Sequence, residues 1–476
     1  MILEYFHHFI AELGLISLYK SPLDTKLLCL QRFTRMFAYA TATLILVEYL
    51  SILHISKTKI GVFMTLTLIG DTLISFVLTL FADALGRKSI LAVGSGLMMG
   101  SGIVFAICEN YWVLLAAAVL GVISPSGNEI GPFRAIEEST LAQLTPSSNR
   151  SDIYAWYSLI GTAGQACGFV VSGWVINYLR NECGWTDVST YRAVFWSYAL
   201  FGFIKFLLSV GLSQAVEIER KDLPVEDPEI APLLGNGAEE VVATKKGYFA
   251  SKLPDISKES KIVVLNLCLL MGLDSFASGL VPLSWVTYFF REKFGIEEGK
   301  LGSLFFTTSI ISACSMLVAS SLAKRFGNVK YLQQTMALTH FPSTIFLALI
   351  PVPSRLPFAI TFLILRHSTA SMDAVPRSAF IAAVVHSHER TAVMGLLNVV
   401  KTFAQSLGPV ITGVLAGHNL FWAVFVSAGI LKACYDLGLL AVFAGHQTHD
   451  DKVEEERRVL EAEARAVAER SANLER

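Results

Sequence analysis

Single charged side chains lie within several of the long apolar stretches of this sequence. A charge at the centre of a bilayer costs about 2.5 to 3.5 kcal/mol on insertion scales, so such residues usually face a cavity or an opposite charge. Groups of this kind bind polar solutes or carry protons. They are Arg35, Glu48, Asp71, Glu129, Lys205, Asp274, Arg366, Asp373, Lys401, Lys432 and Asp436.

Two of these bases are expected near the middle of the bilayer. Arg366 lies ten residues into the predicted span 356–379, and Lys401 reaches a similar depth in the span 392–416. At a rise of about 1.5 Å per residue, this depth is close to the midplane of a hydrocarbon core about 30 Å thick. Two bases at that level suit a polar or anionic substrate group. The alternative is that they pair with Asp274 or Asp373 on neighbouring helices.

Two acids each precede a proline by three residues. Glu129 is followed by Pro132 and Asp373 by Pro376. Proline removes a backbone hydrogen bond and opens the helix, and broken helices at membrane depth commonly line a cavity. Burial disfavours the charged form of a carboxylate, so Glu129 is the first candidate to carry a proton. Asp373 is expected to contact substrate, since Arg366 lies two turns earlier on the same face.

Two further pairs follow from spacing. Arg35 and Asp274 occupy corresponding positions of the two halves of the sequence and are expected to pair at the cytoplasmic end of a pathway. Lys432 and Asp436 are four residues apart, so they are expected to neutralise each other on one helix face. For Asp71, a hydrogen bond that packs two helices together and a role in a cavity are equally expected.

A short polar turn joins two apolar runs, 60–82 and 89–108. It reads Asp83-Ala84-Leu85-Gly86-Arg87-Lys88, with a glycine that can end a helix and two bases that favour the cytoplasmic side. The turn resembles the signature loop of the major facilitator superfamily, G-x-x-x-D-x-x-G-R-[K/R], with Thr79 at the place of the first glycine. We expect Asp83 to accept hydrogen bonds from a neighbouring span.

The same loop is expected to act as a gate. Arg87 is predicted to bridge to Glu137 or Glu138, and such contacts would exist in only one access state.

Composition restricts the class of protein. The chain has 476 residues, of which 53% are hydrophobic and 16% charged, which is too apolar for an ordinary soluble enzyme. The formal net charge of -1 gives no reason to expect a nucleic-acid partner. The cysteines form no metal-binding pattern. We find no ATP-binding loop, redox motif or nucleophile with a base, so neither a cofactor nor an enzymatic activity is predicted.

The apolar runs predict twelve membrane-spanning helices, because every backbone amide in such a run must be paired within the run. They are 31–53, 60–82, 89–108, 111–133, 152–179, 192–213, 262–290, 300–323, 330–350, 356–379, 392–416 and 420–443.

The segments outside the spans complete the predicted organisation. Residues 1–30 are expected to form a cytoplasmic segment, 214–260 a disordered linker rich in proline and charge, and 444–476 a charged tail. Lys and Arg are more frequent in the connections on the side of both termini, so both termini are predicted to be cytoplasmic.

An internal repeat predicts the fold. An offset of 241 aligns Gly61, Thr67 and Gly86 with Gly302, Thr308 and Gly327, and nearby offsets align further blocks in the same order. Two parallel six-helix halves, 31–213 and 261–443, follow. With the signature loop, this predicts an all-α integral membrane protein with the major facilitator fold.

The resemblance implies a secondary active transporter that moves a small organic solute by alternating access and draws on an ion gradient, most simply of protons. The alternative is a relative that has lost transport and acts as a membrane receptor or scaffold. The protein is expected to be monomeric and to reside in the plasma membrane.

Overall fold

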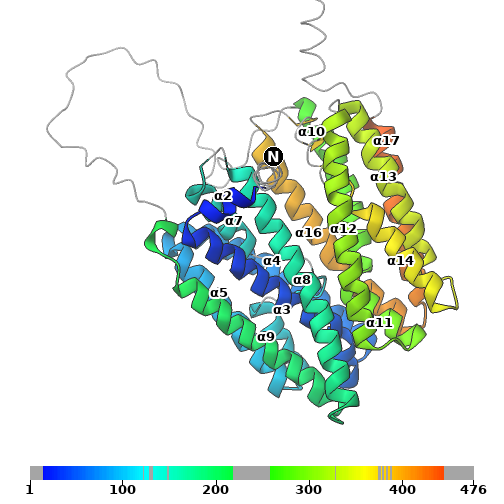
Figure 1. Ribbon diagram of the computed structural model, residues 1–476. Coiled ribbons are helices and arrows are strands. Elements are labelled where there is room, and N and C mark those ends of the chain that lie inside the picture. The colour runs from blue at the N-terminus through cyan, green and yellow to red at the C-terminus, as the bar shows by residue number, and fades with distance from the viewer. Residues whose placement is uncertain are drawn as a thin grey trace, which may run out of the picture.

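The computed structural model describes residues 14–443 except 122, 128–131, 147–148, 218–257, 327–328, 374–376, 378–379, 382–383 and 386–388. In these residues the regular structure is helical (Figure 1). Eight helices are long and apolar enough to cross a membrane, and two shorter apolar helices accompany them. The predicted linker 214–260 and tail 444–476 lie outside the described residues, apart from 214–217 and 258–260.

The N-terminal half contains the helices that follow one another from the first described residues to Val210. They are α2 (Leu15–Lys20), α3 (Leu23–Ile52), α4 (Lys57–Leu85), α5 (Arg87–Ile107), α6 (Tyr111–Leu120), α7 (Pro132–Leu144), α8 (Arg150–Asn181) and α9 (Asp187–Val210), followed by the 3-10 turn η1 (Gln214–Val216). The first spanning helix begins at Leu23, earlier than the predicted 31, because Pro22 precedes its first turn and presets the entry.

The C-terminal half repeats this arrangement. Its helices are α10 (Lys258–Leu280), α11 (Leu283–Phe294), α12 (Glu298–Phe326), α13 (Val329–Leu349), α14 (Leu356–Ala370), α16 (Arg390–Gly417) and α17 (Phe421–Phe443). The two halves stand side by side in Figure 1, with α8 of the first against α12 of the second and α4 against α16.

Three predicted spans are interrupted within the described part of the chain. The span 111–133 is divided into α6 and α7, and the predicted single span 262–290 is divided into α10 and α11 at Pro282, which lacks an N–H group. The span 356–379 leaves its helix at Ala370 and continues as a turn at Asp373. Pro132 is the first residue of α7 and Pro376 lies outside the described residues, so the opening of a helix at these two prolines stays a prediction. The interruption before Pro282 was not predicted.

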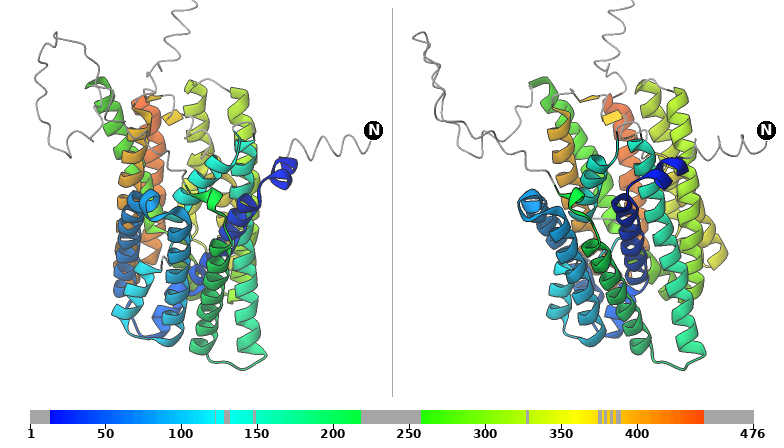
Figure 2. Two further views of the ribbon diagram at one scale, coloured as in Figure 1. Left: turned by 90° about the vertical axis from the view of Figure 1, so that its left-hand side faces the viewer. Right: turned by 60° about the vertical axis from the view of Figure 1, so that its left-hand side comes forward.

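Two faces of the bundle can be distinguished. We call the face that holds Gly86 and η1 the signature face, and the face that holds the connections 53–56, 182–186 and 295–297 the far face. The signature face is uppermost in Figures 1 and 2, where the junction of α8 and α9 lies at the lower end. Gly86 has φ 87 and joins α4 to α5 directly, so a side chain there would be strained.

The halves touch along the far-face portions of their helices. Gly61 of α4 packs directly on the backbone of Gly413 of α16, where a side chain on either would collide with the other helix. The Thr65 hydroxyl accepts from the amide of Val410 close by, at 3.1 Å. Backbone contact of this kind, made possible by small residues, brings the two halves together at the far face.

Candidate functional site

A cavity of about 440 Å³ lies between the two halves. It is lined by polar and aromatic side chains from α8 and the α6–α7 break on one side and from α10, α12, α14 and α16 on the other. They include Ser126, Thr162, Gln165 and Phe169 from the N-terminal half and Ser278, Phe305, Ser312, Arg366, His367 and Gln405 from the C-terminal half. A cavity with walls from both halves is accessible only from the face at which the halves separate.

Arg366 is the charged group of this cavity. Within the described residues, no acid lies within 4.0 Å of its guanidinium. Its neighbour His367 is placed by Ser312, whose hydroxyl lies 3.2 Å from Nδ1. The alternative in which Arg366 pairs with Asp274 or Asp373 is therefore excluded in this structure. An uncompensated guanidinium in a cavity is suited to an anionic ligand.

The two predicted acids of the C-terminal half pair instead with Arg377 and Lys432. Asp274 Oδ2 lies 3.1 Å from Nη1 of Arg377, and Asp274 Oδ1 lies 2.5 Å from Nζ of Lys432. Arg377 also binds Asp373, four residues earlier. Both acids are buried, at 5% and 2% exposure. Lys401 is half-buried on α16 and forms no ion pair with another described residue.

The predicted pair of Lys432 with Asp436 is wrong. Asp436 accepts from Nδ1 of His340, which is 3.0 Å from both carboxylate oxygens, while Lys432 points to Asp274. The two side chains share a helix, but each has a closer partner on a neighbouring helix. Arg377 was not selected from the sequence, although its i,i+4 spacing from Asp373 was a usable signal.

A second buried network lies inside the N-terminal half. Arg35 donates two hydrogen bonds to Glu137, at 2.5 and 2.9 Å, and both side chains are fully buried. The Tyr157 hydroxyl donates to the same carboxylate at 2.5 Å. The predicted pair of Arg35 with Asp274 is therefore wrong: each residue finds its partner within its own half, where the helices are packed.

The signature loop contacts different residues from those predicted. Arg87 Nη1 donates to Gln143 Oε1 at 2.9 Å, whereas Glu137 is taken by Arg35 and Glu138 by Arg134 at 2.7 Å. Asp83 lies inside α4 rather than in a loop, and its side chain is outside the described residues, as is Glu129. The predicted partners of Arg87 are therefore incorrect in this structure.

Glu217 caps the first turn of α5, although no motif or spacing had marked this residue as a candidate. Its carboxylate accepts from the backbone amides of Arg87, at 2.8 Å, and Lys88, at 3.1 Å. Lys88 Nζ in turn donates to the carbonyl of Leu212 at 2.6 Å. A carboxylate at a helix N-terminus satisfies free amides and the helix dipole. The cap therefore ties the start of α5 to the chain that follows α9.

We expect Glu217→Gln to weaken this cap by about 1 kcal/mol, because the amide lacks the charge that favours a helix N-terminus. Amide hydrogen exchange at Arg87 and Lys88 should become about fivefold faster. Glu182→Gln, at an exposed position of the far face, is the matched control and should leave these amides unchanged. Equal exchange in the parent and Glu217→Gln would show that the cap contributes no stability.

The far face is closed by a cluster of charges that connects the halves. Glu298 of α12, which is 2% exposed, accepts from Arg180 of α8 at 2.8 and 3.1 Å and from the hydroxyl of Tyr191 at 2.5 Å. Arg291 of α11 also binds Glu298, and its Nε lies 3.2 Å from Glu48 of α3. These residues lie at helix ends, so the sequence offered only Glu48 as a candidate.

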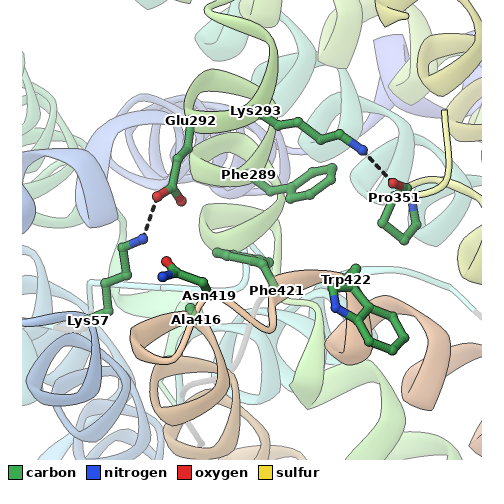
Figure 3. A pocket seen from close by; sticks show the side chains of 9 residues that line it. All are labelled: Lys57, Phe289, Glu292, Lys293, Pro351, Ala416, Asn419, Phe421 and Trp422. Atoms are coloured by element: carbon green, nitrogen blue, oxygen red, sulfur yellow. Dashed lines mark hydrogen bonds and ion pairs between the residues drawn. The ribbon is translucent and has the colours of Figure 1, made fainter. Parts of the chain in front are cut away.

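A smaller cavity of about 390 Å³ lies on the far face (Figure 3). Lys57 of α4 contributes to it from the N-terminal half and pairs with Glu292 of α11. The remaining lining residues come from the C-terminal half, where Lys293 donates to the carbonyl of Pro351. The Lys57 to Glu292 pair is thus a second ionic link between the halves, and it is more exposed than the cluster around Glu298.

Comparison with known proteins agrees with this architecture. The family model described as Major Facilitator Superfamily matches residues 28–283 and 267–471. The uncharacterized membrane protein YJR124C of Saccharomyces cerevisiae is 36% identical over 428 residues, which cover 89% of this chain and 94% of the relative.

Solved structures show the same fold at lower identity. A bacterial homolog of the human lysosomal transporter Spinster, in an inward-facing and occupied conformation, gives a TM-score of 0.67 at 13% identity and covers 89% of this chain and 96% of its own. A D-xylose-proton symporter gives 0.66 at 14% identity, with 87% and 96% covered. The predicted two-bundle fold is confirmed, and the protein is an integral multi-pass membrane protein. The family match over nearly the whole length, together with the yeast relative, shows that this chain belongs to the Major Facilitator Superfamily.

Proposed function

We propose that the protein is a secondary active transporter that moves a small organic solute with an anionic group across the membrane. The observation that carries this proposal is Arg366, which faces a cavity built from both halves and has no acid within 4.0 Å among the described residues. A partly buried guanidinium that has no counter-charge among the described residues gains most from a ligand that brings one. The volume of the cavity, about 440 Å³, suits a small organic molecule.

Alternating access follows from the distribution of contacts. The Glu298 cluster and the Gly61 to Gly413 contact hold the halves together at the far face. Rocking one half against the other would break these contacts and present Arg366 to the far side. We place the signature face in the cytoplasm, with both termini, because the connections on that side are richer in Lys and Arg.

Energy for uphill movement would come from an ion gradient, and we propose protons because each half holds a buried network of ionisable side chains. The D-xylose-proton symporter with the same fold shows that this architecture accommodates such coupling. We further propose that the segment 214–260 links the halves 31–213 and 261–443, and that one chain in the plasma membrane is the functional unit.

The test starts from purified full-length protein and a panel of small organic acids, sugars and neutral drugs, screened by thermal stabilisation. We expect organic anions to stabilise the protein and to enter proteoliposomes that contain it. Arg366→Gln should weaken binding of the best anion at least tenfold, since a hydrogen bond to a charged group contributes about 1.5 to 3 kcal/mol. Arg366→Lys should retain part of the affinity.

Lys293→Gln is the control, because it removes a lysine from the far-face cavity and leaves the central one intact. Stabilisation by neutral compounds alone, or full anion affinity in Arg366→Gln, would contradict the assignment of an anionic substrate. Anion binding without flux would instead favour the receptor or scaffold.

A further inference from the structure

Lys205 of α9 is a fully buried base without a hydrogen bond. Its Nζ lies 3.6 Å from Oε1 of Glu137 and 3.6 Å from the centre of the Phe133 ring, and the side chain is 0% exposed. Within the described part of the chain, Nζ has no hydrogen-bond partner. An ammonium group removed from water normally requires such partners, because burying an uncompensated charge is costly.

The nearest carboxylate is already occupied. Glu137 accepts two hydrogen bonds from Arg35 and one from Tyr157, and Arg32 stacks on the Tyr157 ring at 4.1 Å. Three basic side chains therefore gather around one acid. Of these bases only lysine can give up its proton, since arginine remains charged in proteins.

Among the described residues, the other elements packed on this region place no second acid within 4.0 Å of Lys205. On α3 the remaining ionisable groups near the cluster are Cys29 and Tyr39, which are both buried. Asp71 of α4 is buried and forms no ion pair with Lys205. From α5, Ser95 faces Ser209, one turn beyond Lys205. Lys205 therefore lies between an aromatic ring and a carboxylate already bound by Arg35, and its Nζ makes no hydrogen bond to another described residue.

We propose that Lys205 carries the coupling proton and that its amine is neutral while the far face is closed; this rests on the proposed function of proton-coupled transport. As the protein enters the conformation seen here, one N–H bond of the ammonium breaks and the proton passes to water. On the return, Nζ takes a proton from water and again becomes an ammonium. The step needs no other reactant.

The same helices connect Lys205 to the far-face closure. A charged Lys205 competes with Arg35 for Glu137 and so weakens the contact of α3 with α7. At its far end α3 carries Glu48, which binds Arg291, and α8, which carries Tyr157, also carries Arg180, which binds Glu298. Protonation of Lys205 therefore acts on the two helices that hold the closure, and it should favour opening of the far face.

The experiment measures the closed state without any substrate. Full-length protein in lipid nanodiscs carries spin labels at Cys183 and at a cysteine replacing Arg355, in an otherwise cysteine-free background. Both positions lie in far-face connections of opposite halves. Between about pH 6 and 9, the ratio of closed to open molecules should rise with pH, with a limiting slope of about tenfold per pH unit for one proton.

Lys205→Met should remove this slope and keep the far face closed, because it abolishes the competing charge. Lys205→Arg should also remove the slope but shift the population toward the open state, since the guanidinium stays charged. Ser209→Ala, one turn away on the same helix, is the matched control and should keep the parent slope. If Lys205 had only a structural role, both variants would change the ratio of closed to open molecules, but this ratio would still depend on pH as in the parent.

A parent protein without a pH-dependent ratio, or a parental slope in Lys205→Met, would overturn the proposal. If Lys205→Met does not fold, Lys205→Arg and Lys205→Gln provide the same comparison. If no organic anion stabilises the protein but the ratio of closed to open molecules still depends on pH through Lys205, the assignment of an anionic substrate is rejected and the assignment of Lys205 stands. Uphill flux driven by pH in Lys205→Met would reject Lys205 as the proton carrier and leave the transporter assignment standing.

Discussion

Asp274→Asn is expected to lower the free energy of unfolding by about 3 kcal/mol, because removing one partner of a buried ion pair leaves the opposite charge uncompensated. The Asp274 carboxylate accepts a hydrogen bond from Nζ of Lys432 at 2.5 Å. Arg377 binds both Asp274 and Asp373. The neutral amide would leave Lys432 buried without an acid and Arg377 with only one. Denaturant unfolding in mixed micelles, followed by tryptophan fluorescence, measures the loss.

Asp436→Asn is the matched control for this prediction. Asp436 is also buried and lies one turn from Lys432, but its partner is the imidazole of His340 rather than an ammonium or guanidinium group. We therefore expect a loss of about 1 kcal/mol, typical of a single hydrogen bond. Equal losses in the two variants would mean that the buried charge of Lys432 is stabilised in another way.

Glu298→Gln is expected to open the far face. The carboxylate is 2% exposed and receives both nitrogens of Arg180, the Tyr191 hydroxyl and Arg291. Its loss leaves two guanidinium groups around a neutral amide, at a cost of about 3 kcal/mol to the closed state. The ratio of closed to open molecules should fall roughly 100-fold.

A cysteine replacing Ser309 in the central cavity reports this change. In a cysteine-free background, a membrane-impermeant thiol reagent added on the far side should label it much faster in Glu298→Gln than in the parent. Glu292→Gln is the control, because its pair with Lys57 is partly exposed and such pairs contribute about 0 to 1 kcal/mol. Unchanged labelling in Glu298→Gln would show that the Glu298 cluster does not keep the halves closed.

The sequence was most informative where a property depends on one segment. Apolar runs located the spanning helices, although three of the predicted spans are interrupted in the described part of the chain. Gly86 was expected to end a helix and does so with φ 87. Arg366 was selected from its distance along one helix, and the residue lines the central cavity.

Pairing between helices was predicted poorly. In the structure, five residues have partners other than those predicted for them; they are Arg35, Asp274, Arg87, Lys432 and Asp436. Spacing within a helix gives the depth and the face of a residue relative to its neighbours. It does not give the direction in which that face points relative to another helix. Rotation of a helix about its axis by a few tens of degrees changes which acid a base contacts.

The sequence by itself determined that this chain is a repeated set of membrane-spanning helices with a signature loop, because hydrophobic length and internal repetition are properties of the chain alone. Only the tertiary structure decided that Glu298 closes the far face. It also decided that, among the described residues, Arg366 has no acid within 4.0 Å and Lys205 shares the one carboxylate near it with Arg35. Each of these depends on side chains from helices distant in sequence. The packing of the helices fixes which of them meet.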